Sequence, residues 1–223
     1  MNMNLKSTTK PACILVGAGD APYKKIPVRE EDYLIAVDGG YDYCKAWQLE
    51  PDLVLGDFDS VNPALKEEII RRQQENPETT RVLPVMKDDT DMLAALRSGL
   101  EKGYRLFYLY GGCGGRLEHT IANIQCLKFL KSQGAEGYLF SNQERIFIIQ
   151  NETVHFSANT TGLFSLFALQ KAVTGVTIRG MKYPLADAAL TDEYPIGISN
   201  EFLGEPAEVC IKDGTALAIV SRG

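Results

Sequence analysis

The first 142 residues alternate short apolar runs with segments of helical periodicity, and this alternation constrains the fold more than any other feature. Strands are expected at the apolar runs 12–17, 33–38, 52–57, 81–86 and 105–111. Helices are expected at 63–75, 90–103 and 117–134. Strands that alternate with helices need crossover connections, so the pattern predicts an α/β fold with a mostly parallel, Rossmann-like sheet and flanking helices.

The rhythm changes near Glu144. The remaining chain consists of short β-like runs separated by Gly, Asn, Asp and Pro, with no long helical period: RIFIIQ, TVHFSA, GLFSLFAL, AVTGVTIRG, AEVCIK and ALAIVS. This pattern predicts a small all-β C-terminal domain, sandwich-like or barrel-like. We therefore expect an α/β domain over residues 11–142 and a β-domain over residues 143–223.

Composition excludes several classes of protein. The chain is 45% hydrophobic and 23% charged, as in ordinary globular proteins, and its net charge of −6 argues against a nucleic-acid partner. The polar start MNMNLKSTTK does not resemble a signal peptide, and no apolar stretch is long enough to span a membrane. The five scattered cysteines form no CxxC pair, which favours reduced thiols in the cytoplasm.

Acidic residues follow four of the expected strands. They are Asp38 in DGG, Asp57 and Asp59 in GDFDS, Asp88, Asp89 and Asp91 in KDDTD, and Glu118 in GGRLEH. Each cluster alone could be a polar turn or a helix N-cap. Together they would meet at one edge of the sheet, where unpaired carboxylates repel one another unless a cation lies between them. Hard oxygen ligands of this kind favour Mg²⁺ together with a phosphate substrate.

Glycines occupy the same strand ends. Gly17 and Gly19 follow the first strand, Gly39 and Gly40 the second, and GGCGGR (111–116) the fifth. Glycine-rich loops allow backbone N–H groups to approach phosphate closely, and Arg116 and Lys87 are candidate phosphate-binding cations. The GxxxxGK[ST] pattern of a P-loop is absent from the sequence.

The motifs, in their order along the chain, resemble those of the thiamine pyrophosphokinase family. They are DGG (38–40), GDFDS (56–60), KDDTD (87–91) and GGCGGRLEH (111–119), followed by GVTIRGMKYPLADAAL (175–190) and PIGISNEF (195–202). The resemblance implies transfer of a pyrophosphoryl group from ATP to thiamine, giving thiamine diphosphate and AMP, with Mg²⁺. It also implies a homodimer in which the β-domain of one subunit completes the site of the other.

The resemblance assigns roles to individual residues. Asp57, Asp59 and Asp91 match the acidic residues that handle metal and phosphate, and with Arg116 they form the expected catalytic set. Residues expected to bind ATP or thiamine are Asp38, Gly39, Gly40, Lys87, Arg116, Glu118, Ser199, Asn200 and Phe202. Phe202 or Tyr183 could cover a face of the thiamine ring, and Asp91 or Asp59 could accept the hydroxyl proton.

One position departs from the family pattern. The family usually has an aspartate two residues after GGR, whereas this chain has Glu118, whose side chain is one methylene longer. That difference could shift a metal contact or route it through water.

Three alternatives to this function remain. A related pyrophosphokinase could act on another hydroxymethyl heterocycle such as a pterin, and a non-catalytic protein could sense thiamine or nucleotide. The clustered carboxylates argue against a sensor, which needs no metal ligands. A glycosyltransferase with a DxD motif would match Asp57 and Asp59 but would not explain the C-terminal half.

Overall fold

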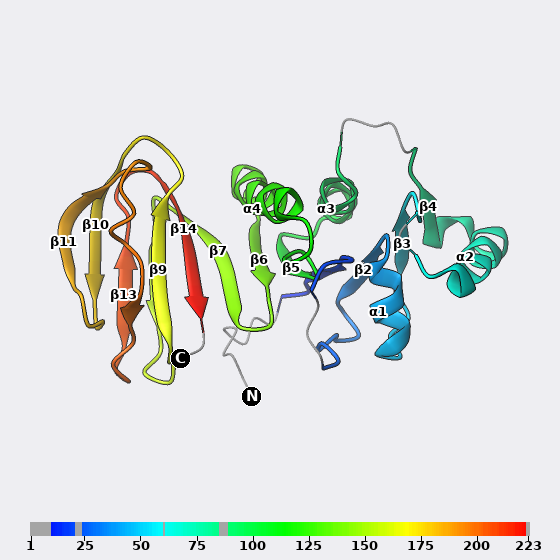
Figure 1. The fold of residues 1–223 in the computed structure, drawn as a ribbon, viewed down its shortest axis with the longest axis horizontal. Coiled ribbons are helices and arrows are strands. Elements are labelled where there is room, and N and C mark those ends of the chain that lie inside the picture. The colour runs from blue at the N-terminus through cyan, green and yellow to red at the C-terminus, as the bar shows by residue number, and fades with distance from the viewer. Residues whose placement is uncertain (1–9, 21–23, 60, 85–88, 222–223) are drawn as a thin grey trace. The chain divides into compact units, whose positions relative to one another are not determined.

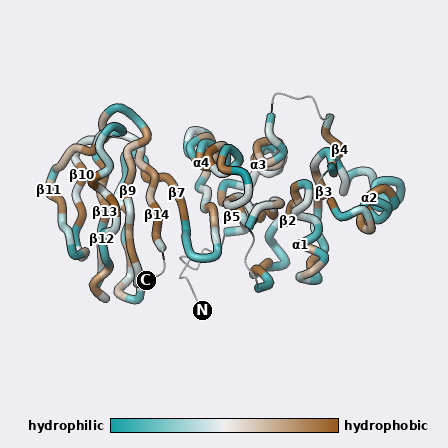
Figure 2. The backbone as a smooth tube through the Cα atoms, viewed as in Figure 1, coloured by the Kyte–Doolittle hydropathy of each residue, from teal (hydrophilic) through white to brown (hydrophobic). Residues whose placement is uncertain are grey.

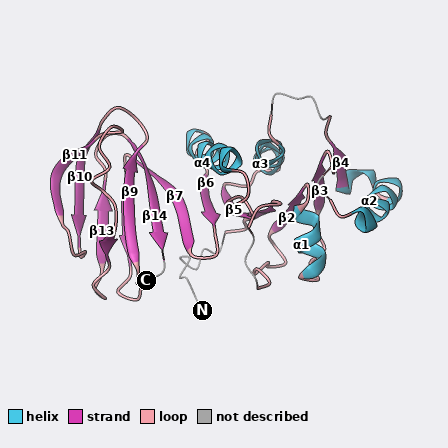
Figure 3. Ribbon diagram, in the orientation of Figure 1, coloured by secondary structure: helices cyan, strands magenta, loops and turns pink. Residues whose placement is uncertain are grey.

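The structure, a computed structural model, describes residues 10–20, 24–59, 61–84 and 89–221. These residues form two compact units that divide between Asn142 and Gln143. Helices occur in the first unit, and the described part of the second unit contains strands and turns only (Figure 3). None of the described helices is long and apolar enough to cross a membrane.

The first unit is built on a parallel sheet (Figure 1). Its strands are β1 (Cys13–Val16), β2 (Tyr33–Val37), β3 (Leu53–Gly56), β4 (Thr80–Val82), β5 (Leu106–Tyr110) and β6 (Glu136–Phe140). They lie in the order β6-β5-β1-β2-β3-β4, and every neighbouring pair is parallel. All residues of β1, β3 and β5 are buried, as expected for a sheet covered on both faces.

Helices α1 (Gly40–Ala46), α2 (Pro63–Glu75), α3 (Asp91–Glu101) and α4 (Leu117–Ser132) connect these strands, and a short 3₁₀ helix η1 (Pro77–Thr79) follows α2. Figure 1 shows α3 and α4 together on one side of the sheet and α1 on the other. Tyr41 of α1 donates a hydrogen bond to Glu68 of α2 at 2.9 Å, so these two helices are neighbours. The expected α/β fold class is confirmed.

The direction of strand addition reverses beside β1. The chain adds β2, β3 and β4 on one side of β1, then returns to add β5 and β6 on the other. Ligands of open α/β sheets bind at the carboxyl ends of strands where the order reverses in this way. The loops that follow β1 and β5 flank this position, and Asp38 follows the adjacent β2.

Several element boundaries differ from the sequence-based expectation. The strand expected at 81–86 corresponds to β4, which spans Thr80–Val82; Pro84 has no N–H to donate to a strand ladder, and residues 85 and 86 lie outside the described residues. Helix α1 was not predicted, because it is short and opens on the turn-like pair Gly39-Gly40. Strand β6 was also missed, because it is a brief run directly after a helix end.

The second unit contains two antiparallel groups of strands. One has the order β12-β9-β14-β7, from β7 (Glu144–Gln150), β9 (Leu163–Ala168), β12 (Asn200–Glu201) and β14 (Thr215–Ser221). The other has the order β11-β10-β13-β8, from β8 (Thr153–Phe156), β10 (Val173–Arg179), β11 (Leu185–Leu190) and β13 (Ala207–Cys210). Figure 2 shows hydrophobic residues recurring along these strands.

Aromatic packing joins the two groups of strands. Phe156 of β8 lies 5.7 Å from Phe164 of β9, ring centroid to centroid, and 5.1 Å from Phe202. The predicted all-β C-terminal domain is confirmed. Strand β11 was not anticipated, because its alanine-rich sequence LADAAL carries no β signal; pairing with β10 holds it in the sheet.

Candidate functional site

Three carboxylates meet at the carboxyl edge of the parallel sheet. One oxygen each from Asp38, Asp57 and Asp59 can be chosen so that all three lie within 4.8 Å of one another. Asp38 and Asp57 are half-buried and Asp59 is exposed. Carboxylate oxygens this close together repel one another and suit a hard cation such as Mg²⁺, so the residues present fit the metal that the sequence implied.

Strand pairing brings Asp38 to the other two aspartates. Strands β2 and β3 run parallel with Val37 opposite Leu55, so both strands end at the same edge. The backbone N–H of Asp38 donates to the Leu55 carbonyl at 2.7 Å, and Asp38 adopts a φ of +50°. This left-handed conformation turns the chain sharply at the end of β2 and keeps Asp38 beside β3.

A tight turn separates Asp57 from Asp59. The Asp57 Oδ1 accepts a hydrogen bond from the Asp59 N–H at 3.1 Å, and the intervening Phe58 has a φ of +61°. Aspartate side chains commonly close turns of this kind onto the N–H two residues ahead. The side chain of Phe58 is half-buried. The DxD sequence is thus a turn that also presents two carboxylates on one edge of the sheet.

The KDDTD segment is placed differently. Asp91 is the first residue of α3, and the Thr90 hydroxyl caps that helix by accepting from the Leu93 N–H at 3.2 Å. Asp89 pairs with Arg97, Oδ2 to Nε, at 3.2 Å. Among the described residues, Asp91 does not belong to the group formed by the other three aspartates. Lys87 and Asp88 lie outside the described residues.

The glycines after β1, β2 and β5 permit close backbone contacts. The Gly17 N–H donates to the Tyr110 carbonyl and the Gly19 N–H to the Gly111 carbonyl, both at 2.8 Å. A side chain on Gly40 would overlap the Val16 carbonyl oxygen, so α1 begins directly against β1; Gly39 precedes the helix. Backbone hydrogen bonds therefore join the loop after β1 to the loop after β5, beside the reversal of strand order.

Arg116 and Glu118 form an exposed ion pair at the start of α4. The Arg116 Nε lies 2.7 Å from the Glu118 Oε1, and both side chains are more than half exposed. The hydrogen bond from Arg116 lowers the pKa of the Glu118 carboxyl. In this structure the longer side chain of Glu118 thus reaches Arg116.

Asn200 has a structural position in the second unit. It is buried, its amide donates to the Tyr183 carbonyl at 2.8 Å, and its Oδ1 accepts from the N–H groups of Tyr183 and Glu201, both at 2.9 Å. Ser199 is exposed, with a φ of +57°, and its N–H donates to the Ser165 hydroxyl at 3.1 Å. Asn200 therefore holds the Tyr183 segment in place, while Ser199 faces solvent.

Phe202 lies in the aromatic core of the second unit. It is 7% exposed and packs against Phe156 and Phe164. Tyr183, in contrast, is 58% exposed, with the Lys182 ammonium 5.9 Å from its ring centroid. Of the two aromatic residues named as candidates to cover thiamine, Tyr183 is the accessible one.

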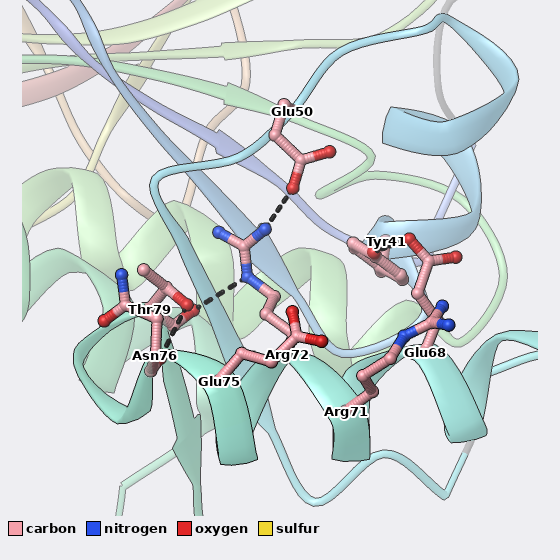
Figure 4. Close-up of a pocket in the computed structure, with 8 residues that line it drawn as sticks. All are labelled: Tyr41, Glu50, Glu68, Arg71, Arg72, Glu75, Asn76 and Thr79. Carbon is pink, nitrogen blue, oxygen red and sulfur yellow. Dashed lines mark hydrogen bonds and ion pairs between the residues drawn. The ribbon is translucent and has the colours of Figure 1, made fainter.

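A pocket that none of the three aspartates lines is formed by α1, α2, Glu50, Asn76 and Thr79 (Figure 4). It encloses about 330 Å³. Its central charges are already paired: Arg72 contacts Glu50 and the carbonyls of Pro51 and Thr79, and Glu68 accepts from Tyr41 and from Lys45. The hydrogen bond from Lys45 lowers the pKa of Glu68. We infer that these groups stabilise the packing of α1 and α2 within the first unit.

The structure groups Asp38, expected to bind ATP or thiamine, with Asp57 and Asp59, as the adjacency of their strand ends indicated; its role in binding stays a prediction. Asn123 was not singled out, although it is a polar residue on the buried stripe of α4 and donates to the Gly112 carbonyl. A polar residue in a buried helical stripe is the signal that could have found it.

Comparisons with known proteins identify the family of the chain. A family model described as thiamin pyrophosphokinase, catalytic domain, matches residues 26–139, and one described as thiamin pyrophosphokinase, vitamin B1 binding domain, matches residues 149–215. The chain is 26% identical over 193 residues to the thiamine pyrophosphokinase of Bacillus subtilis (strain 168), which covers 86% of this chain and 88% of the relative.

Solved structures show the same fold. Thiamine pyrophosphokinase from Bacillus subtilis superposes with a TM-score of 0.82 at 25% identity, covering 96% of this chain and 99% of that chain. The enzyme from Geobacillus thermodenitrificans gives a TM-score of 0.79 at 26% identity, covering 95% and 98%.

An α/β unit with three clustered carboxylates at the carboxyl ends of β2 and β3, followed by an all-β unit, is an arrangement typical of a metal-dependent phosphotransferase. The chain belongs to the thiamin pyrophosphokinase family. It is an enzyme that transfers a pyrophosphoryl group from ATP to thiamine, giving thiamine diphosphate. The pterin and sensor alternatives are not favoured.

Proposed function

We propose that the first unit binds the ATP triphosphate at the carboxyl edge of its sheet and that the second unit binds thiamine. The thiamine hydroxyl attacks the β-phosphorus, a new O–P bond forms, and the bond from Pβ to the α–β bridging oxygen breaks. AMP leaves with that electron pair. The observation that carries this proposal is the convergence of Asp38, Asp57 and Asp59 at the carboxyl ends of the neighbouring strands β2 and β3.

Asp38, Asp57 and Asp59 are the residues that would hold Mg²⁺. The ion, when bound, offsets charge on the triphosphate oxygens. The protein's own groups orient the substrate: the glycine loop after β5 offers backbone N–H groups, and the planar Arg116 guanidinium binds phosphate oxygens in exchange for Glu118. Catalysis by positioning and charge stabilisation is typical of phosphoryl transfer.

Asp91 has a different proposed role. It stands at the start of α3 and outside the group of three aspartates, and we assign it as the carboxylate that accepts the thiamine hydroxyl proton. Asp59 is the second candidate, because it is the exposed member of the group. The two candidates can be distinguished by the Mg²⁺ dependence of activity. Replacing Asp59 should change it, because Asp59 is in the metal-binding group, whereas replacing Asp91 should not.

The reaction is tested by incubating the protein with ATP, Mg²⁺ and thiamine and separating the nucleotides. We expect AMP and thiamine diphosphate in equal amounts. Production of ADP, or of thiamine monophosphate, would contradict attack at the β-phosphorus. Asp57→Asn should retain the fold and lose most activity, because one metal-binding oxygen becomes an amide nitrogen.

We further propose that the enzyme is a homodimer whose sites are shared between subunits. The second unit exposes Tyr194, Ile196, Ile198 and Leu203, each at least half exposed, which is compatible with an interface. Mixing Asp57→Asn with Ser199→Arg tests sharing, because a cation at exposed Ser199 would repel cationic thiamine. Shared sites should restore about a quarter of wild-type activity in the mixture, since half of randomly paired dimers carry one intact site. Sites confined to one chain would restore none.

The compartment is a proposal as well. None of the five cysteines, all of them in the described residues, forms a disulfide, and four of them are buried. Free thiols are typical of a reducing compartment, where ATP is also available, so we place the enzyme in the cytoplasm.

A further inference from the structure

Three consecutive carbonyl groups of the glycine loop, defined as residues 111–115, are each tied down by a hydrogen bond. The Gly111 carbonyl accepts from the Gly19 N–H at 2.8 Å and the Cys113 carbonyl from the Asp20 N–H at 2.7 Å. The Gly112 carbonyl between them accepts from the Asn123 side-chain amide at 2.7 Å. Two of the three bonds are therefore made by main chain, and one depends on a side chain.

These bonds fix the course of the loop. A trans peptide is planar, with its C=O and N–H pointing in opposite directions, so anchoring the carbonyl also orients the N–H of the next residue. Beyond the anchored part, Gly114 and Gly115 have φ angles of +79° and +59°, and Gly115 is exposed. The exposed end of the loop, which leads into Arg116, therefore continues from an anchored segment. Asn123 helps to hold that segment in place.

The position of Asn123 suits it to hold the Gly112 carbonyl. It is 7% exposed and shares the buried stripe of α4 with Cys126, Leu127 and Leu130. A buried amide costs free energy unless it is hydrogen-bonded, so an apolar residue would serve packing better. Gly112 packs closely against its neighbours: an added Cβ would lie 2.6 Å from the Leu139 Cδ1 and 3.2 Å from the Asn123 Nδ2.

We propose that Asn123 is a positioning residue for ATP, acting through the Gly112 carbonyl to hold the glycine loop in its triphosphate-binding conformation. This inference rests on the proposed function, in which that loop contacts the triphosphate. Asn123 is buried and acts through the loop, so its loss should weaken ATP binding and leave thiamine binding unchanged.

The test compares Asn123→Ala and the milder Asn123→Ser, which keeps a hydroxyl on a shorter side chain. KM for ATP, KM for thiamine and kcat are measured with Mg²⁺ at saturating co-substrate. We expect KM for ATP to rise roughly tenfold in Asn123→Ala, the usual consequence of losing one buried hydrogen bond, and less in Asn123→Ser. KM for thiamine should stay within about twofold of wild type, because only the ATP loop is affected.

Ser98→Ala is the matched control. Ser98 is also 7% exposed and donates to a backbone carbonyl, that of Ala94, but it lies within α3. We expect it to lower the melting temperature without raising KM for ATP. Should Asn123→Ala not fold, Asn123→Ser carries the same comparison, and the rise in melting temperature caused by ATP with Mg²⁺ gives a second measure of binding.

The outcomes separate the inference from the function beneath it. A wild-type protein that forms no thiamine diphosphate from ATP would overturn the proposed function. If the wild type is active and the Asn123 variants lose melting temperature with KM for ATP within twofold, Asn123 is merely structural and the inference fails. Equal increases in KM for ATP and for thiamine would also overturn it.

Discussion

Gly56 at the end of β3 lies directly against Asp38. A Cβ added to Gly56 would come within 2.9 Å of the Asp38 Cα and 3.1 Å of its Cβ, a separation that requires one residue to move. The Asp38 N–H is bonded to Leu55, the residue before Gly56, so the two strand ends fit only when position 56 has no side chain. Glycine here is what allows Asp38 to join Asp57 and Asp59.

Gly56→Ala should therefore separate Asp38 from the other two aspartates. We expect at least a tenfold loss of kcat/KM and a higher Mg²⁺ concentration for half-maximal activity, because misplacing a group by about 1 Å can reduce a rate on the order of a hundredfold. Gly103→Ala is the control: alanine is strained at its φ of +91° and should lower stability, but no atom lies within 4 Å of the added Cβ and Gly103 follows α3 at its far end, so the Mg²⁺ requirement should stay as in wild type. An unchanged Mg²⁺ requirement in Gly56→Ala would contradict the proposed metal-binding set.

Asp91→Asn separates proton transfer from metal binding. Because Asp91 is outside the group of three carboxylates, we expect kcat to fall by about 10²–10⁴-fold while the Mg²⁺ dependence stays as in wild type. Asp57→Asn should shift the Mg²⁺ dependence instead. Mg²⁺ titrations of activity in both variants make the comparison, and a shared shift would place Asp91 among the metal ligands.

The Arg116–Glu118 pair predicts a kinetic effect with little change in stability. Arg116→Ala should raise KM for ATP about tenfold, since one charge-assisted contact to phosphate is lost. Arg116→Lys should recover part of the loss, because an ammonium keeps the charge without the planar fork. Melting temperatures should not change measurably, because exposed ion pairs contribute about 0–1 kcal/mol.

Glu118→Gln asks whether Glu118 does more than hold Arg116. If the carboxylate only competes with phosphate for the guanidinium, KM for ATP should change by no more than about fivefold, the equivalent of a surface ion pair. A loss of kcat well beyond that factor would show that Glu118 contacts the reacting groups or the cation. Glu118→Asp, which restores the usual family residue, should then be the more active of the two variants.

Elements whose ends are marked by capping residues or prolines could be predicted from the local sequence. Helix α2 was predicted at its observed bounds because Asn62 caps it, Pro63 occupies its first position and Pro77 follows its end. Helix α1 and strand β11 have no comparable signal and depend on tertiary packing.

The sequence predicted which strand ends carry the site residues, but it did not predict which carboxylates lie together in space. GDFDS gave Asp57 and Asp59 directly, because a turn within a few residues keeps them together. Which further carboxylate joins them depends on the order of strands in the sheet: β2 neighbours β3, whereas Asp91 begins a helix. That order is set by long-range packing, which no single motif encodes.

The position of Phe202 predicts a loss of stability. Its ring packs against Phe156 and Phe164 in the core of the second unit, so Phe202→Ala should destabilise the protein by about 3–5 kcal/mol. Phe202→Leu keeps most of the volume and should fold with KM for thiamine within about twofold of wild type. Exposed Tyr183 is the comparison: Tyr183→Ala should raise KM for thiamine with little change in melting temperature. The reverse pattern would return Phe202 to the thiamine site.

Asp32 predicts how stability depends on pH. Its carboxylate, 4% exposed, accepts from the Ala12 and Arg29 N–H groups, both at 2.9 Å, and from the Arg29 guanidinium. Burial alone would raise the pKa of Asp32, but these hydrogen bonds outweigh it and hold the pKa below the ordinary value of 3.8. A depressed folded-state pKa stabilises the native state at pH values above the unfolded-state pKa, and this contribution is lost as pH falls through the folded-state pKa.

Asp32→Asn should therefore destabilise the protein by about 2 kcal/mol near pH 7, where wild-type Asp32 is ionised and bonded. The difference in free energy of unfolding between wild type and variant should shrink as pH falls below about 4, because wild-type Asp32 then becomes protonated. Glu31→Gln is the control, since Glu31 pairs with the same Arg29 at 3.1 Å but is exposed, so its effect should stay below about 0.5 kcal/mol. Denaturant titrations from pH 3 to pH 8 measure both differences. A pH-independent difference for Asp32→Asn would show that its carboxylate contributes through shape and not through charge.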